Sequence, residues 1–237
     1  MTQLIIGLGN KARHGKDSFA SAIDSHFASQ YYAAQKHGLR NYHPVEIQRL
    51  AFADALYKEV NAWLKVTTGG GQLEYAAEGS YVVPPVLGVS SVVQIPEWVK
   101  PTPNAERSDR APYGKHAKLL QWWGTEYRRS QDPDYWVKAW KAAINPKAHI
   151  VLATDMRFLN EAAAIKSLRG STVQVNRLNA DGTPFVDPTR DANHVSEIEL
   201  DNYNYDHKIT VKTGQQALLE EYAITLVHYL RVMKGQR

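Results

Sequence analysis

The chain has 237 residues, with 28 lysines and arginines against 24 acidic residues and no cysteine. This length suits one α/β domain with insertions, and the lack of cysteine excludes a disulfide framework, a thiolate metal site and a cysteine nucleophile. A net charge of +4 suits a protein that handles anionic small molecules and is too weak to indicate a nucleic-acid polymer as partner. No apolar run approaches the ~18 residues of a membrane span, and no export leader begins the chain, so we expect a cytoplasmic protein without membrane contact.

The stretch 4–18 combines a strand, a loop and the start of a helix. Residues 4–8 are apolar and predict a buried strand, the loop ends in Gly15-Lys16, and the amphipathic segment 17–32 predicts a helix. This is the context of a phosphate-binding loop, in which backbone N–H groups, a helix N-terminus and a lysine surround an anion. The alternative is an ordinary turn. The loop residues that we expect around the anion are Asn10, Arg13, His14, Gly15 and Lys16.

Two residues depart from the general pattern G-x-x-x-x-G-K-[ST]. Asn10 replaces the first glycine, but asparagine is the residue after glycine that best tolerates positive φ, so the turn stays feasible. Asp17 follows the lysine where a hydroxyl is expected, and Ser18 comes one residue later. Asp17 is therefore either a group on the magnesium side of the site or an acid that caps the helix.

The segments that follow are less specific. Residues 45–52 alternate and predict a second strand, and residues 54–66 predict a helix. The stretch 67–112 is rich in proline and contains a Gly-Gly-Gly run, so it predicts an insertion or arm. Within it we expect a short β-ribbon from residues 81–83 and 91–95.

A helix predicted over 113–130 carries a polar stripe beside Trp122. An amide can pair with a base edge, an indole can stack on the base, and a cation can hold a phosphate. Gly124 lowers helix stability and indicates a close approach by a ligand or by backbone. The alternative is a solvated helix face with the tryptophans in the core. The side chains that share one face at 100° per residue are Lys118, Gln121, Thr125 and Arg128.

The run 149–155 predicts a buried strand that ends in Asp155. Because ligand groups gather at the carboxyl ends of parallel strands, we expect Asp155 and Arg157 at the same sheet edge as the Gly-Lys loop. There Asp155 can hold magnesium through water and Arg157 can clamp a phosphoryl group, oriented by Glu161 one helical turn on. The alternative is a surface ion pair between Arg157 and Glu161.

The remaining segments predict two strands, 171–177 and 207–211, and a closing helix, 215–233. Between the strands lies a polar loop, and the segment 178–194 is a candidate lid that could bring an arginine over the phosphates. Arg177 precedes this loop and Arg190 lies within it.

Six short motifs follow one another along the chain: Gly15-Lys-Asp-Ser18, Phe52-Ala-Asp-Ala-Leu56, Leu120-Gln with Trp123-Gly-Thr-Glu126, Asp132 followed by Tyr135-Trp136, Asp155-x-Arg157-Phe-x-Asn-Glu161, and His194-x-Ser-Glu197. Together and in this order they resemble the deoxynucleoside monophosphate kinases of tailed bacteriophages. The similarity covers most of the chain and leaves out 67–112. An aspartate after the loop lysine is typical of the family that the chain resembles.

The resemblance implies one P-loop kinase domain over 1–237. The implied fold is a three-layer α/β sandwich with a central, mostly parallel five-stranded sheet, flanking helices, a lid and the 67–112 insertion. The implied reaction transfers the γ-phosphoryl group of ATP, with Mg²⁺, to a deoxynucleoside 5′-monophosphate, in the supply of phage DNA precursors in the host cytoplasm. A homodimer is left open.

The resemblance also implies roles for individual residues. It places the ATP phosphates and the metal at Lys16, Asp17 and Ser18, and it places Asp155, Arg157 and Glu161 between the two substrates. Around the acceptor nucleotide it places Lys118, Gln121, Gly124, Thr125 and Trp136, and by position we add Trp122, Arg128, Asp155 and Arg157. The expected catalytic residues are Lys16, Asp17, Ser18, Lys118, Arg157 and Glu161.

Two other functions stay open from the residues alone. One is a kinase of the same architecture acting on another phosphorylated small molecule, such as dephospho-coenzyme A or a phosphomevalonate-like acceptor. The other is a nucleotide-binding module without catalytic activity. The polar stripe with its stacking side chains favours a nucleotide acceptor, although it leaves the accepted bases open.

Overall fold

The computed structural model describes residues 3–68, 80–83, 91–94, 96–99, 105–188 and 192–235. The chain divides into two compact units. The first, here called the sheet unit, combines Met1–Phe52 with Lys141–Arg237, and the second, the helical unit, is Ala53–Trp140. The helical unit is therefore a single long insertion into the chain that builds the sheet, and it contains the whole of the predicted arm.

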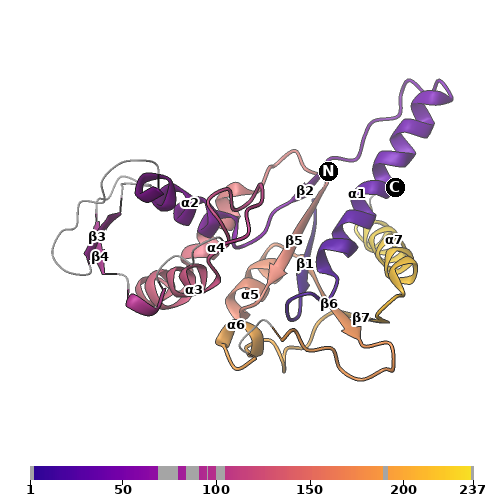
Figure 1. Cartoon of the computed structure of the whole chain (residues 1–237). Coiled ribbons are helices and arrows are strands. Elements are labelled where there is room, and N and C mark those ends of the chain that lie inside the picture. The colour runs from indigo at the N-terminus through magenta and orange to yellow at the C-terminus, as the bar shows by residue number, and fades with distance from the viewer. Residues whose placement is uncertain are drawn as a thin grey trace. The chain divides into compact units, whose positions relative to one another are not determined.

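Five parallel strands form the sheet unit, in the order β2-β5-β1-β6-β7 (Figure 1). β1 is central because it pairs with β5 on one side and β6 on the other. The carboxyl ends of these three strands lie at the point where the strand order reverses, which is where open α/β sheets bind ligands. The predicted α/β class is confirmed. The strands are β1 (Leu4–Gly9), β2 (Ile47–Arg49), β5 (Ile150–Met156), β6 (Ser171–Leu178) and β7 (His207–Lys212).

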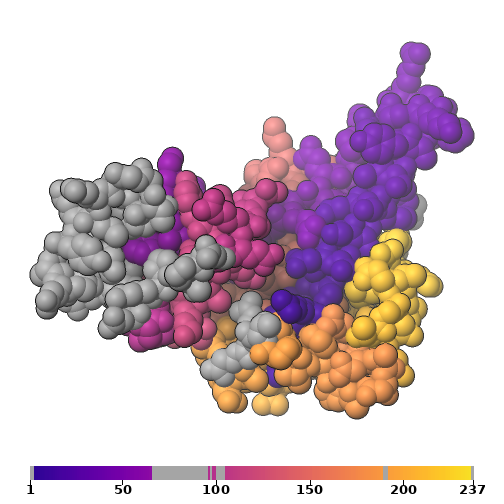
Figure 2. Space-filling model, viewed as in Figure 1, coloured from indigo at the N-terminus to yellow at the C-terminus, as the bar shows by residue number. Residues whose placement is uncertain are grey.

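Helices cover both faces of this sheet. α1 (Lys16–Lys36) and α7 (Gln216–Met233) pack together on one face, as Figure 2 shows in indigo and yellow, and alternate β1 residues enter their shared apolar core. α5 (Leu159–Ser167) covers the other face. A Cβ added at Gly7 of β1 would lie 2.9 Å from Ile165 of α5, so this glycine permits close packing of the helix. These layers agree with the predicted sandwich and are consistent with a P-loop-kinase-like architecture.

The helical unit holds a short ribbon and a group of helices. β3 and β4 pair in antiparallel fashion, as predicted from residues 81–83 and 91–94, whereas residue 95 lies outside the described residues. Within the described ranges no helix is both long and apolar enough to cross a membrane. The elements are α2 (Asp54–Thr68), β3 (Ser80–Val83), β4 (Ser91–Gln94), η1 (Glu97–Val99), α3 (Ala117–Gln121), η2 (Trp122–Arg129) and α4 (Tyr135–Ala143), whose last residues belong to the sheet unit.

The helix expected over 113–130 differs from its prediction in a way that matters for the polar stripe. The helix begins at Ala117, and from Trp122 to Arg129 it continues as the π-helix η2. A π-helix bonds i to i+5 and turns through less than 100° per residue. The faces assigned on α-helical geometry therefore do not hold beyond Gln121.

A buried carboxylate lies at the centre of the helical unit. Glu59 of α2 is 4% exposed and accepts hydrogen bonds from Trp123 Nε1 and Arg128 Nε, both at 2.9 Å, and from the Tyr135 hydroxyl. Burial, together with the bond to Glu59, raises the pKa of Tyr135 to about 12. Arg128 also lies over the rings of Tyr127 and Tyr135, with its guanidinium 5.1 and 4.8 Å from their centroids.

We predict that Glu59→Ala destabilises the helical unit by ~3 kcal/mol, because it leaves the half-buried Arg128 without its counter-ion. All six tryptophans lie between residues 63 and 140, so urea unfolding followed by tryptophan fluorescence reports on this unit. Lys58→Ala, an exposed change on the same helix, is the control and is expected within ~0.5 kcal/mol of wild type. Equal midpoints for the two variants would contradict the central role of Glu59.

Candidate functional site

The loop between β1 and α1 is built on left-handed backbone. Asn10, Arg13 and Gly15 have φ of 106°, 58° and 95°, so the predicted tolerance of asparagine at the first position is confirmed. The Asn10 side chain also ties the loop to the sheet, since Nδ2 donates to the Val175 carbonyl of β6 at 2.9 Å and Oδ1 accepts from the Lys11 N–H at 2.8 Å. The loop is thus held in a tight curve at the carboxyl end of β1.

The Lys16 ammonium lies inside this curve. Nζ donates to the carbonyls of Asn10 at 2.9 Å and Lys11 at 2.6 Å, and the residue is only 7% exposed. Burial lowers the pKa of Lys16 to about 7, and the guanidinium of Arg157 acts in the same direction. An anion bound in the loop would favour the charged form and reverse this shift.

His14 and Arg177 join the loop to the segment that follows β6. Nδ1 of His14 accepts the Arg177 backbone N–H at 3.0 Å. Burial, with Lys16 nearby, lowers the His14 pKa to about 4, so the ring is neutral at physiological pH and carries its proton on Nε2. The Arg177 guanidinium lies 3.5 Å from the ring centroid of Phe185, where cation–π attraction holds it. Arg190, the other predicted lid arginine, lies outside the described residues.

Arg157 follows the end of β5, which neighbours β1. Its Nη1 forms an ion pair with Glu197 Oε2 at 3.0 Å. Its backbone N–H donates to Glu161 Oε2 at 2.7 Å, and the same oxygen accepts the Phe158 N–H at 3.2 Å. Glu161 therefore fixes the backbone at Arg157 at the start of α5. The alternative of a surface ion pair between these two side chains does not fit Glu161, which is 2% exposed.

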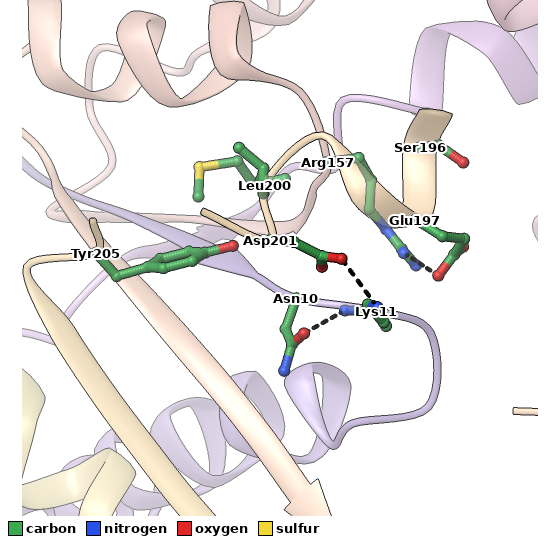
Figure 3. A pocket seen from close by; sticks show the side chains of 9 residues that line it. Asn10, Lys11, Arg157, Ser196, Glu197, Leu200, Asp201 and Tyr205 are labelled. Carbon is green, nitrogen blue, oxygen red and sulfur yellow. Dashed lines mark hydrogen bonds and ion pairs between the residues drawn. The ribbon is translucent and has the colours of Figure 1, made fainter. Parts of the chain in front are cut away.

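A small pocket brings the loop and Arg157 together (Figure 3). Lys11 lines one side and pairs with Asp201 at 3.2 Å, while Arg157 and Glu197 line another. Tyr205 is 5% exposed, and no acceptor for its hydroxyl proton is present among the described residues. Arg157 and the glycine-lysine loop thus lie at one edge of the sheet, as the sequence predicts.

The residues predicted to hold magnesium, Asp17, Ser18 and Asp155, offer oxygen ligands, but by themselves they do not form a complete coordination shell. Asp17 lies in the first turn of α1 with its side chain 86% exposed and Arg49 at 3.6 Å, and Ser18 follows it. Asp155 Oδ1 accepts the Phe52 N–H at 2.6 Å. Among the described residues no three acidic or histidine side chains gather as a metal site. Magnesium usually takes one or two carboxylates and completes its shell with water and substrate phosphates, a requirement that this donor set fits.

The predicted acceptor residues from Lys118 to Trp136 belong to the helical unit, whereas Asp155 and Arg157 belong to the sheet unit. Lys118 is exposed and Gln121 and Thr125 are half-buried, whereas the other members of the set are engaged with protein groups. Arg128 binds Glu59, and Trp122 stacks on Tyr127 with their ring centroids 5.4 Å apart. Nucleotide binding by these residues stays a prediction.

Gly124 is in close contact with other side chains of the helical unit, among them Trp136. The Trp136 Nε1–H donates to the Gly124 carbonyl at 2.9 Å, and a Cβ at Gly124 would lie 3.0 Å from the Leu56 side chain. The close approach predicted at this glycine is therefore made by neighbouring side chains of the same unit.

Several residues of the site were not predicted. Glu197 stood in a recognised motif without a role, and Phe185 and Asp201 gave no local signal because their partners are distant in sequence. Glu59 could have been found, since it lies within the apolar face of α2 at helical spacing from Leu56 and Trp63.

No family model matches this chain, and no curated protein is significantly similar to it. The functional proposal therefore rests on the motifs of the sequence and on the geometry of the loop and its neighbours.

The lowered pKa of Lys16 predicts a pH-dependent contribution to anion binding. Below pH 7 the free lysine is already charged, so its contribution is constant; above pH 7 binding must first take up a proton, so the contribution falls, by up to ~10-fold per pH unit. The measurement is the ratio of ATP dissociation constants, Lys16→Met over wild type, by titration calorimetry from pH 6 to 9. The ratio cancels the titration of ATP itself, and a ratio that stays constant to pH 9 would contradict the shift.

Proposed function

We propose that this protein is an ATP-dependent kinase that phosphorylates a deoxynucleoside 5′-monophosphate. The observation that carries the proposal is the strained loop at the carboxyl end of β1, with the Lys16 ammonium held within it and Arg157 on the same edge. The motif order of the sequence, which resembles phage deoxynucleoside monophosphate kinases, supports the choice of acceptor.

In this reaction the protein forms no covalent bond with either substrate. An oxygen of the acceptor phosphate attacks the γ-phosphorus of ATP, and the bond to the β-phosphate oxygen breaks to release ADP. The acceptor oxygen is already anionic, so no strong base is required. Positioning and neutralisation of charge in the transition state then determine the rate.

The charged groups at the edge of the sheet have complementary roles in this proposal. Lys16 and the loop N–H groups hold the ATP phosphates, and Arg157 contacts the transferred group. Asp17, Ser18 and Asp155 would hold Mg²⁺ directly or through water. When bound, the ion would neutralise part of the phosphate charge.

In this proposal, residues of the helical unit bind the base of the acceptor. Lys118 is exposed, Gln121 and Thr125 are half-buried, and the three carry an amine, an amide and a hydroxyl. These groups suit a phosphate and the polar edge of a base. Trp122 and Trp136 are buried in the apolar core of the same unit.

We predict that Lys16→Ala and Arg157→Ala each lower turnover by at least ~100-fold, the scale for losing one charged partner of the transition state. Lys208→Ala, an exposed change on β7, is the matched control and should retain wild-type turnover. Circular dichroism checks that each variant is folded. Wild-type turnover by a folded Arg157→Ala protein would remove that residue from the proposed site.

The acceptor is identified by ADP release in a coupled assay with ATP and Mg²⁺. The panel comprises dAMP, dGMP, dCMP, dTMP, hydroxymethyl-dCMP, the ribonucleotides and dephospho-coenzyme A. We expect release with at least one deoxynucleotide. Release with dephospho-coenzyme A alone would indicate the other class of kinase, and ATP binding without release with any acceptor would contradict a kinase of either class.

A further inference from the structure

The motif His194-x-Ser-Glu197 has no role in the reaction proposed above, yet it places a carboxylate in the pocket. His194 caps the short helix α6 (Val195–Ile198): its Nδ1 accepts the Ser196 N–H at 3.2 Å and lies 2.8 Å from the Ser196 hydroxyl. The cap fixes the first turn, and Glu197 extends from it toward Arg157 (Figure 3).

One oxygen of Glu197 contacts both parts of the candidate site. Oε2 accepts the Ala12 backbone N–H of the loop at 3.3 Å, and it lies 3.0 Å from Arg157 Nη1. The side chains of Glu197 and Arg157 are 6% and 17% exposed. A carboxylate from the segment after β6 thus bridges the β1 loop and the residue that follows β5.

We propose that Glu197 is a positioning residue, whose carboxylate holds Arg157 in register with the phosphate-binding loop. The proposal rests on the proposed kinase function, in which Arg157 must meet a phosphoryl group held by that loop. We assign Glu197 no contact with substrate, because its Oε2 accepts the Ala12 N–H and also forms the ion pair with Arg157.

Charge and geometry explain why such a residue is needed. Arg157 is largely buried, and its positive charge repels that of Lys16. The guanidinium therefore lowers the pKa of the lysine. A nearby carboxylate offsets this repulsion. The guanidinium has five N–H donors, and Nη1 approaches Glu197 without forming a hydrogen bond of good geometry. Nη1 is therefore left without a hydrogen bond, while the ion pair sets the position of the group.

The first test compares Glu197→Gln with Glu199→Gln. Glu199 belongs to the same short segment, and its Oε1 accepts the Leu159 N–H at 2.8 Å instead of touching the loop or Arg157. We expect Glu197→Gln to lower kcat ~10- to 100-fold, the scale of a lost interaction with a charged group, with both KM values nearly unchanged. Glu199→Gln should keep the wild-type kcat. Equal kcat for the two variants would overturn the proposal and leave the kinase function standing.

The second test separates positioning from folding. If Glu197 acts through Arg157, then Glu197→Gln should cost little further activity in an Arg157→Ala protein. A purely structural role would lower kcat by the same factor in both backgrounds, and that result would overturn the proposal.

A third measurement does not depend on kinase activity. Phenylglyoxal modifies arginine, and mass spectrometry of the peptide that contains residue 157 follows its rate. We expect faster modification of Arg157 in Glu197→Gln than in wild type or Glu199→Gln. If no acceptor is phosphorylated by wild type, the proposed function fails, yet this rate still tests the ion pair; an unchanged rate would overturn the positioning by Glu197.

Discussion

The site depends on one buried cation that the loop itself solvates. The Lys16 ammonium has lost most of its water and is bound by the carbonyls of Asn10 and Lys11, residues of its own loop. Carbonyls can converge in this way only if the backbone curls tightly, which explains the positive φ at three positions of the loop. Because the carbonyls turn inward to the lysine, the curvature of the loop holds the ammonium within it.

A second constraint is the distribution of carboxylates around this edge. Asp187 pairs with Arg13, Glu197 with Arg157, and Asp201 with Lys11. All three acids come from the segment between β6 and β7, whereas the cations come from the β1 loop and the end of β5. An incoming polyanion would compete with these acids. The exposed pair of Lys11 and Asp201 is weak in water, whereas the buried Glu197 would stay in place and set the geometry.

Much of the fold could be predicted from local patterns. The short apolar runs at β1 and β5 predict buried strands. Helices between successive strands predict parallel pairing. Parallel pairing in turn brings the end of the run 149–155 to the edge where the Gly15-Lys16 loop lies. The faces of η2 could not be predicted in this way, because the 100° spacing of an α-helix does not apply to a π-helix.

Local sequence patterns do not predict which distant residue pairs with a charged side chain. Arg128 and Arg157 both look like free cations for a phosphate when only spacing is considered, yet each is bound by a carboxylate far away in the chain, Glu59 and Glu197. Burial requires this, since an arginine beside an apolar core without a counter-ion would cost several kcal/mol. The two pairs differ in their surroundings. The first lies against two tyrosine rings of the helical unit, whereas the second lines a pocket beside the loop that carries Lys16.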